Sequence, residues 1–255
     1  MAERLCVITG AARGIGLATA QQMAAAGSTV VMVDIDGDAL AVAAGTVPGS
    51  VALVRDVAEP GDVDAIAQEV EALGGRLHAL VNNAGLADFG PLAETTAERW
   101  HAVMRTNLDG PFLMTQAVLQ ALKAARGAVV NIASISALRA STLRVAYGTS
   151  KAAVAHLTQQ QAVELGEFGI RVNCVCPGPV RTKLAMAVHT QEIIHAYHDA
   201  IPLGRYGREP EIAEAIVWLC SPKASYVTGQ RLSVDGGFEA TGIGLPALRR
   251  ATNGA

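Results

Sequence analysis

The amino-acid sequence predicts an α/β protein with a doubly wound parallel sheet in a single domain. Short runs rich in Val, Ile and Leu alternate along the chain with longer stretches of helical pattern. The short runs lack the alternation of polar and apolar residues that marks a half-exposed strand, so both faces of the sheet are covered by helices. With 255 residues, of which 51% are hydrophobic, the chain can bury one large core. Repeated strand–helix–strand units of this kind specify a doubly wound sheet.

The elements follow one another without a linker, a low-complexity tract or an internal repeat, so residues 1–255 are expected to form one domain. The predicted strands are residues 5–9, 29–34, 51–55, 79–82, 128–132, 171–176 and 231–234. The predicted helices are residues 15–26, 63–73, 97–124, 146–168 and 210–219. In such a sheet, ligands bind outside the carboxyl ends of the strands, where the strand order reverses. Motifs that directly follow strands are therefore the candidates for function.

The bulk composition excludes several classes of partner. Only 17% of the residues are charged and the formal net charge is −3, without the basic face of a nucleic-acid binder. The N-terminus has no signal-peptide anatomy and no apolar run is long enough to cross a bilayer, which predicts a cytoplasmic protein without membrane contact.

The four cysteines, Cys6, Cys174, Cys176 and Cys220, lie in apolar surroundings and are expected to be buried, unpaired thiols. Cys174 and Cys176 fall on one face of a strand, which leaves a redox or metal role as a minor alternative. His195 and His198 have a spacing that two metal ligands could share, but no third ligand accompanies them. The sequence thus predicts no metal site.

A glycine-rich turn follows the first predicted strand and opens the first predicted helix. It reads Thr9-Gly-Ala-Ala-Arg-Gly-Ile-Gly16. Glycines at positions 10, 14 and 16 allow a tight turn, and the free N–H groups and dipole of a helix N-terminus favour an anion. The turn, with Arg13 and Ile15 between its glycines, is therefore a candidate site for a dinucleotide pyrophosphate; a glycine turn without a ligand is the alternative.

Asp34 ends the second predicted strand. A carboxylate at this place can accept both hydroxyl groups of an adenosine ribose and would repel a 2′-phosphate, which favours NAD over NADP. Two observations oppose this interpretation: Asp34 could simply cap the following acidic turn, and Arg13 could reach toward a 2′-phosphate. Because no basic residue follows Asp34 in its own loop, NAD is preferred.

The candidate chemistry lies around the fifth strand and the helix that follows it. Tyr147 and Lys151 are four residues apart, so their side chains lie on one helix face. An ammonium beside a phenol is expected to lower the phenol pKa, which suits a general acid–base near neutral pH. Ser134, just after the strand, can donate to the same substrate oxygen; Ser136 is the second choice. Asn107, inside a predicted helix, could hold a water that relays the proton.

Together these motifs resemble the short-chain dehydrogenase/reductase family, the branch of about 250 residues with a Rossmann fold. The glycine turn has the family spacing G-x-x-x-G-x-G, and Asn107, Ser134, Tyr147 and Lys151 match its catalytic tetrad in order. The resemblance spans residues 5–237, including Asp235-Gly-Gly237. Beyond the glycine turn and Asp34, it implies cofactor contacts from Asp56, Val57, Asn83, Ala84, Gly85, Tyr147, Lys151, Pro177, Gly178, Val180 and Thr182. Asn82 is expected to be structural and to tie neighbouring strands together.

The resemblance implies an NAD-dependent oxidoreductase that transfers a hydride between a secondary alcohol and the nicotinamide, with Tyr147 as general acid/base. The alcohol is a small molecule such as a polyol, a sugar or a hydroxy acid. The alternatives are an NADP-dependent 3-oxoacyl or other carbonyl reductase and, as a third reading, a non-catalytic nucleotide sensor. The family is commonly homotetrameric, assembled through the helices that carry Asn107 and Tyr147.

Three segments are expected to shape the substrate pocket: residues 86–92, residues 137–145 and a lid of about 183–206. The tail 238–255 matches nothing that assigns it a role. Arg139, Arg144 and Arg181 could meet a carboxylate, sulfonate or phosphate on the substrate, or could equally form surface ion pairs. The sequence does not name the substrate.

Overall fold

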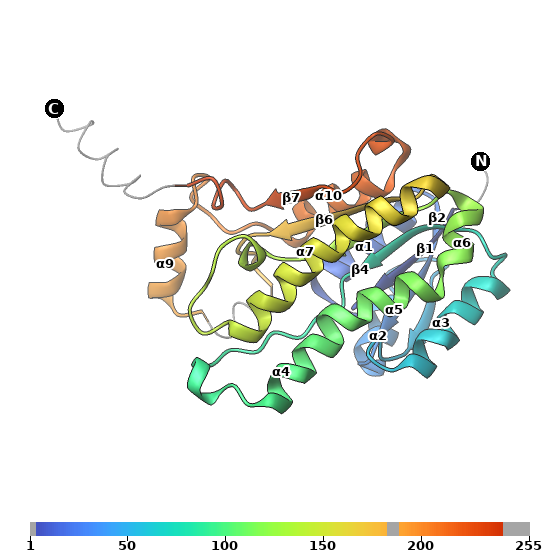
Figure 1. The fold of residues 1–255 in the computed structure, drawn as a ribbon. Coiled ribbons are helices and arrows are strands. Elements are labelled where there is room, and N and C mark those ends of the chain that lie inside the picture. Colours follow the sequence, from blue (N-terminus) through green and yellow to red (C-terminus); the bar gives the residue numbers. More distant parts are fainter. Residues whose placement is uncertain (1–3, 183–188, 242–255) are drawn as a thin grey trace.

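A computed structural model describes residues 4–182 and 189–241. Within them, seven strands form one sheet that is flanked by helices (Figure 1). Its strand order is β3-β2-β1-β4-β5-β6-β7, and every neighbouring pair is parallel. The strands are β1 (Arg4–Thr9), β2 (Ser28–Asp34), β3 (Val51–Val54), β4 (Leu77–Asn82), β5 (Ala128–Ile132), β6 (Arg171–Pro177) and β7 (Arg231–Val234). The predicted doubly wound Rossmann architecture in a single domain is confirmed, with the order reversing between β1 and β4.

Helices cover both faces of this sheet. The α-helices are α1 (Gly14–Ala25), α2 (Gly37–Ala44), α3 (Pro60–Ala72), α4 (Ala97–Met104), α5 (Gly110–Ala117), α6 (Leu119–Ala125), α7 (Val145–Leu165), α9 (Gln191–Ala200) and α10 (Glu209–Cys220). The short helices are η1 (Leu92–Glu94), η2 (Arg105–Asp109), η3 (Ile135–Ala137), η4 (Gly166–Phe168) and η5 (Pro222–Ala224). Among these, η2 is a π-helix and the other four are 3-10 helices.

The core has two main layers, one on each side of the sheet. In β1, Cys6 and Ile8 pack into the layer under α1, α2 and α10, while Leu5 and Val7 pack into the layer under α3, α5, α6 and α7. All four side chains are buried. This explains why the strands read as continuous apolar runs: both pleat directions point into a core.

The predicted helix over residues 97–124 is divided in the structure. It consists of α4, the π-helical segment η2, α5 and α6, with a break at Val118. Pro111 lies in the first turn of α5 and has no N–H to donate to the preceding turn, which fits a change of hydrogen-bond register just before it. Hydrophobic periodicity alone did not reveal this change.

Helix α2 was not predicted. Its sequence is short and consists largely of Ala, Val and Leu, without a polar face, and it begins where Asp36 accepts a hydrogen bond from Ala39 N at 3.1 Å. That N-cap was the available signal, because Asp is a preferred capping residue.

The predicted lid is described only in part. Helix α9 lies at the end of the molecule toward which β6 and β7 point (Figure 1), while residues 183–188 lie outside the described residues. Most of the predicted tail, residues 242–255, also lies outside them. Within the described ranges, no helix is long and apolar enough to cross a membrane.

Candidate active site

The glycine turn connects β1 to α1 at the point where the strand order reverses. Gly10 and Gly14 adopt left-handed backbone angles, with φ of +63° and +60°. A Cβ on Gly16 would overlap the carbonyl oxygen of Gly10. The N-terminus of α1 has no side-chain cap and no acidic residue in its first turn, so its N–H groups can receive an anion. The turn therefore fits the pyrophosphate of a dinucleotide.

Asn83 and Thr9 hold this turn against the end of β4. Asn83 Nδ2 donates to Thr9 O and to Gly10 O, each at 3.0 Å. Thr9 Oγ1 accepts from the backbone N–H groups of Asn83 and Ala84, also at 3.0 Å. Thr9 was not among the predicted site residues. The only feature of the sequence that could have indicated its role is its position as the last residue of β1, directly before Gly10.

Asp34 organises the loops beside the turn. Its carboxylate accepts from Ala12 N at 3.0 Å and from Asp36 N at 3.1 Å. Asp34 therefore caps the next turn, as the alternative interpretation expected, and also contacts the glycine turn. Its role toward the adenosine ribose stays a prediction. Arg13 forms an ion pair with Asp36. Arg13, the residue that could favour binding of a 2′-phosphate, is therefore already paired with a carboxylate.

The end of β3 contributes Asp56 and Val57. Asp56 Oδ1 accepts from Ala58 N at 2.8 Å, and its own N–H donates to Asp62 at 2.9 Å. Val57 is buried, and its Cγ2 would lie 3.0 Å from a Cβ on Gly110. The pair lies at the carboxyl edge of the sheet, where the resemblance puts the adenine.

Lys151, Asn107 and Gly85 come together at the end of β4. Lys151 is buried and its Nζ donates to Ile132 O at 2.7 Å. A Cβ on Gly85 would lie 3.4 Å from Lys151 Nζ and 3.3 Å from Asn107 Oδ1. Gly85 thus lies within contact distance of both side chains.

Asn107 lies in the π-helical segment rather than in a regular helix. Its Oδ1 accepts from Leu86 N at 2.7 Å, and its Nδ2 donates to Leu86 O and to Ser150 Oγ, each at 2.9 Å. Ser150 Oγ in turn donates to Tyr147 O at 2.8 Å. Through these bonds the Asn107 side chain ties Leu86 to α7. The relay water that the sequence suggested at Asn107 stays a prediction. Ser150 was missed in the sequence.

Tyr147 lies in the first turn of α7, with Lys151 Nζ 5.8 Å from the centroid of its ring. Ser134 is buried at the N-terminus of η3, where its Oγ accepts from Ser136 N at 3.1 Å. Ser136 is also buried, and its Oγ has no hydrogen-bond partner among the residues that the structure describes. The Ser134 side chain is also within hydrogen-bonding reach of Tyr147. The backbone N–H of Ser136 helps to orient the Ser134 hydroxyl.

The ionisation of the two residues differs from the sequence prediction. Burial lowers the pKa of Lys151 to about 8. Burial also raises the pKa of Tyr147, opposed by the Ser134 hydroxyl and by the positive charge of Arg144. The expected lowering of the Tyr147 pKa by Lys151 is therefore wrong for the protein by itself, because desolvation of the phenolate outweighs the nearby cations.

The motif after β6 packs against the end of β7. A Cβ on Gly178 would lie 2.6 Å from Asp235 Cβ, and Gly178 N donates to Val234 O at 3.1 Å. Val180 pairs with Gly207 in an isolated bridge, and Thr182 N donates to Val180 O at 2.8 Å. Pro177, the last residue of β6, thus leads into a segment held from two sides.

A buried polar chain joins the strands beneath the site. Asn82 Nδ2 donates to Asn131 Oδ1 at 2.8 Å, and Asn131 Nδ2 donates to Thr158 Oγ1 and Gln161 Oε1, each at 3.0 Å. The predicted structural role of Asn82 between neighbouring strands is confirmed. These hydrogen bonds also fix α7 relative to β4 and β5.

The thiols and the histidines of the described residues form no metal centre. All four cysteines are free and buried, with Cys174 Sγ 3.9 Å from Cys176 Sγ. No group of three or more His, Cys, Asp or Glu within residues 4–182 and 189–241 is arranged to hold a metal ion.

A cavity of about 640 Å³ lies between α9 and the loop before α10. Its lining residues are Arg181, Gln191, Ile194, His198, Arg205, Tyr206 and Arg208. None of the four candidate catalytic residues is among them.

Comparisons with known proteins agree with this architecture. The family model described as enoyl-(acyl carrier protein) reductase matches residues 10–239. The chain is 37% identical over 240 residues to 3-oxoacyl-[acyl-carrier-protein] reductase FabG of Thermotoga maritima, covering 92% of this chain and 97% of that protein. It is 38% identical over 237 residues to galactitol 2-dehydrogenase (L-tagatose-forming) of Cereibacter sphaeroides, covering 91% and 93%.

A solved structure shows the same fold. The crystal structure of levodione reductase superposes with a TM-score of 0.89 at 31% identity, covering 94% of this chain and 98% of that chain. With the tyrosine, lysine, serine and asparagine gathered beside a glycine turn, and relatives of this similarity over nearly the whole length, the chain belongs to the short-chain dehydrogenase/reductase family of oxidoreductases.

Proposed function

We propose that this oxidoreductase transfers a hydride between a secondary alcohol and NAD, with Tyr147 as the general acid/base. The observation that carries the proposal is the buried Lys151, which Ile132 O holds beside the Tyr147 ring and next to Gly85. An ammonium held in this way favours the phenolate form of a neighbouring tyrosine. A nicotinamide cofactor, which Lys151 and the glycine turn would hold, would supply the hydride acceptor and, in its oxidised form, a further positive charge.

The protein residues divide the remaining tasks. Tyr147 as phenolate takes the hydroxyl proton of the alcohol, and in the reverse direction its phenol returns that proton to the carbonyl oxygen. Ser134 donates a hydrogen bond to the same oxygen and stabilises the charge that develops on it. Lys151 stabilises the phenolate and also holds the nicotinamide ribose. Asn107 positions Leu86 and α7 around them.

The preference for NAD is supported by the contacts of Asp34 and Arg13. The Asp34 carboxylate lies against the glycine turn through Ala12 N, where it would repel a 2′-phosphate. Arg13 is neutralised by Asp36. The contacts of Gly10, Gly14, Ile15, Gly16, Asp56, Val57, Asn83, Ala84, Gly85, Pro177, Gly178, Val180 and Thr182 to the cofactor belong to the same proposal.

The alcohol is proposed to be a small polyol, sugar or hydroxy acid, which the similarity to a galactitol dehydrogenase supports. The second candidate is an NADP-linked 3-oxoacyl or other carbonyl reductase, favoured by the similarity to the Thermotoga 3-oxoacyl reductase. We further propose a cytoplasmic homotetramer with residues 183–206 as a lid. A non-catalytic nucleotide sensor is the least favoured, since Tyr147 and Lys151 are both present.

Replacement of the tyrosine tests the proposal. Tyr147→Phe removes the proton acceptor and keeps the ring, so turnover of alcohols should fall by about 10²- to 10⁴-fold. Cofactor affinity, measured by titration of protein fluorescence, should stay within about a factor of two of the wild type, because ring packing is kept.

Titration of the wild type with NAD and with NADP separates the two candidates. Tighter binding of NAD supports the dehydrogenase, and tighter binding of NADP supports the reductase. Substantial turnover in Tyr147→Phe would remove Tyr147 from the role of acid/base.

A further inference from the structure

Arg144 lies at the N-terminus of α7, three residues before Tyr147. Its guanidinium carbon is 4.8 Å from the centroid of the Phe89 ring, and it forms no ion pair with an acidic residue in the described part of the chain. The other two arginines considered from the sequence are placed differently. Arg139 donates to Phe238 O at 3.2 Å and to Thr241 O at 2.8 Å, and Arg181 lines the neighbouring cavity.

The backbone around Arg144 is held in a defined conformation. Leu143 adopts a left-handed conformation with φ of +63°, which is costly for a branched side chain and needs support from its surroundings. Gly90 N donates to Leu143 O at 3.0 Å, and Gly90 pairs with Arg144 in an isolated bridge. The loop before η1 is thus fastened to the residue that precedes the catalytic helix.

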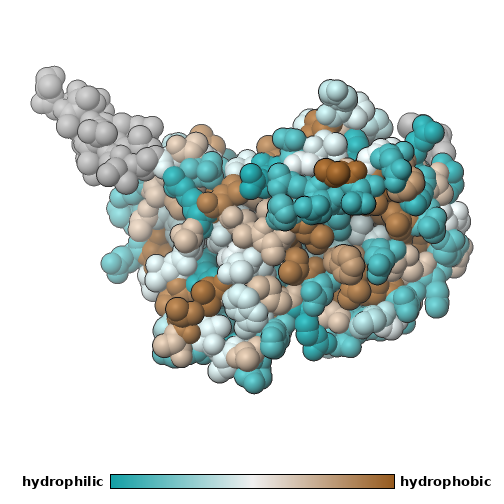
Figure 2. Space-filling model, in the orientation of Figure 1, coloured by the Kyte–Doolittle hydropathy of each residue, from teal (hydrophilic) through white to brown (hydrophobic). Residues whose placement is uncertain are grey.

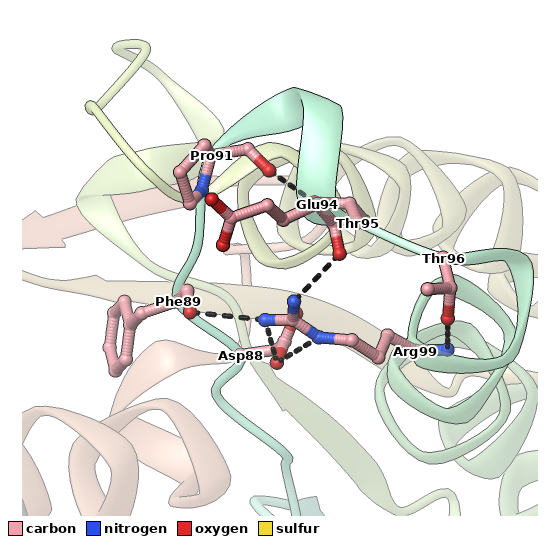
Figure 3. A network of polar contacts seen from close by, with 7 residues as sticks. All are labelled: Asp88, Phe89, Pro91, Glu94, Thr95, Thr96 and Arg99. Carbon is pink, nitrogen blue, oxygen red and sulfur yellow. Dashed lines mark hydrogen bonds and ion pairs between the residues drawn. The ribbon is translucent and has the colours of Figure 1, made fainter.

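Arg99 fastens the other side of this loop, as Figure 3 shows. It donates to Asp88 Oδ1 through Nε at 3.1 Å and through Nη2 at 2.8 Å. It also donates to Phe89 O at 3.1 Å and to Glu94 O at 2.9 Å. Asp88, the acid of this loop, is therefore engaged by Arg99, which also fixes the backbone of Phe89, the residue whose ring contacts Arg144.

Arg144 lies close enough to Tyr147 and to His189, which precedes α9, for its charge to act on both. Burial raises the pKa of Tyr147 and the charge of Arg144 opposes this rise, while burial lowers the pKa of His189 and Arg144 adds to that lowering. A guanidinium that stacks on an aromatic ring keeps the N–H groups at its planar edge available for a second partner. Those N–H groups match the two oxygens of a carboxylate.

We propose that Arg144 binds an anionic group, a carboxylate or a sulfonate, on the alcohol that Tyr147 deprotonates. This inference rests on the proposed function and narrows its substrate class to hydroxy acids and their sulfonate counterparts. Phe89 and the loop pinned by Arg99 hold the guanidinium ready, so little side-chain freedom is lost when the anion binds.

The test compares each of a panel of aliphatic and cyclic hydroxy acids and hydroxy sulfonates with its primary amide, which has a similar shape and no charge. For wild type with NAD, kcat/KM should favour the anion over the amide. In Arg144→Gln that ratio should fall by about 10- to 100-fold, the loss expected for a hydrogen-bonded charge pair, because kcat/KM for the anion should fall far more than kcat/KM for the amide. Arg144→Lys should recover part of the ratio, and Arg139→Gln, the matched control, should leave it unchanged.

Three outcomes overturn the inference: no preference for the anion in wild type, an equal loss for acid and amide in Arg144→Gln, or an equal loss of the ratio in Arg139→Gln. A binding measurement keeps the inference separate from the proposed function. Calorimetric titration of the NAD-loaded protein with the matching oxo acids should show the same dependence on Arg144 even if no alcohol is turned over. Binding that does not depend on Arg144 contradicts the inference, whereas absent turnover with Arg144-dependent binding contradicts only the dehydrogenase.

Discussion

The side chain of Lys151 is buried in the site although a charged amine is more stable in water. A lysine amine is strongly hydrated in the unfolded chain, and here it is buried and donates a hydrogen bond to Ile132 O. Its pKa falls from 10.5 to about 8 as a result. Below about pH 8 the folded protein therefore carries a buried charge that the unfolded chain carries in water, at a cost of about 3 kcal/mol.

This cost predicts the pH dependence of Lys151→Met. The folded-state pKa lies below the unfolded value, so the cost is full below about pH 8 and disappears as the pH rises toward 10.5. The wild type should therefore gain stability relative to the variant over this interval, by up to about 3 kcal/mol. Urea unfolding of both proteins across the interval measures the difference. A constant difference would mean that the amine is solvated in the folded protein.

The sequence predicted which residues form the candidate catalytic site better than it predicted the contacts that these residues make. Tyr147, Lys151 and Ser134 were recognised from their order and spacing, and the structure brings them together. The commitment of the Asn107 amide to Leu86 was not predictable, because it depends on a loop twenty-one residues away in the chain. The direction of the Tyr147 pKa was also missed, since burial cannot be read from spacing.

The glycine turn and α1 act as one element. Gly16 lies in the first turn of the helix, where its missing Cβ allows the Gly10 carbonyl to approach. Gly61 lies in the first turn of α3, and a Cβ there meets nothing within 4 Å. Both glycines thus lie in the first turn of a helix, but only Gly16 has other atoms packed where a Cβ would lie.

We expect opposite effects from alanine at the two positions. Gly61→Ala should stabilise the protein by roughly 0.5–1 kcal/mol, because alanine loses less entropy in a helix. Gly16→Ala should destabilise it by about 1–3 kcal/mol, since the turn must shift to accommodate the methyl group, and should weaken NAD binding. Thermal unfolding with and without NAD checks both, and equal effects would show that the turn is not closely packed.

Elements with a strong apolar signal were predicted almost to their ends. Strand β5 agrees with its predicted range, and α7 begins one residue before its predicted start. The failures were α2, whose residues are small and evenly apolar, and the π-helical segment at Asn107. A change from one helical hydrogen-bond register to another leaves no mark on hydrophobic periodicity.

The whole molecule exposes apolar side chains on the face formed by α5 and α7. Figure 2 shows hydrophobic residues among hydrophilic ones over this face. Phe112 on α5 is 47% exposed and Val163 on α7 is 79% exposed. Such side chains are suited to an interface between subunits, in line with the proposed tetramer.

Val163→Lys should weaken assembly, because an unpaired ammonium buried between subunits costs several kcal/mol. Val42 on α2 has nearly the same exposure, 76%, and lies on another helix. Val42→Lys is therefore the matched control and should leave the mass unchanged. Light scattering after size exclusion measures the mass of each variant. Identical masses for both variants and wild type would remove Val163 from any interface.

The fold as a whole was the most predictable level. Alternating strand and helix signals specified the parallel sheet, and the motifs fell at the carboxyl ends of the strands as the topology requires. The assembly and the substrate remain proposals, because both depend on surfaces whose partners leave no local pattern in the chain.

The contact of Gly178 with Asp235 has a consequence for the synthesis of the protein. A chain that has been translated only as far as β6 lacks the support for the segment that leads to Thr182. Such a chain also lacks α10, whose Ile212 and Ile216 complete the core layer under α1. The glycine turn and the segment after β6 therefore both reach their final packing only when the last quarter of the fold has been made.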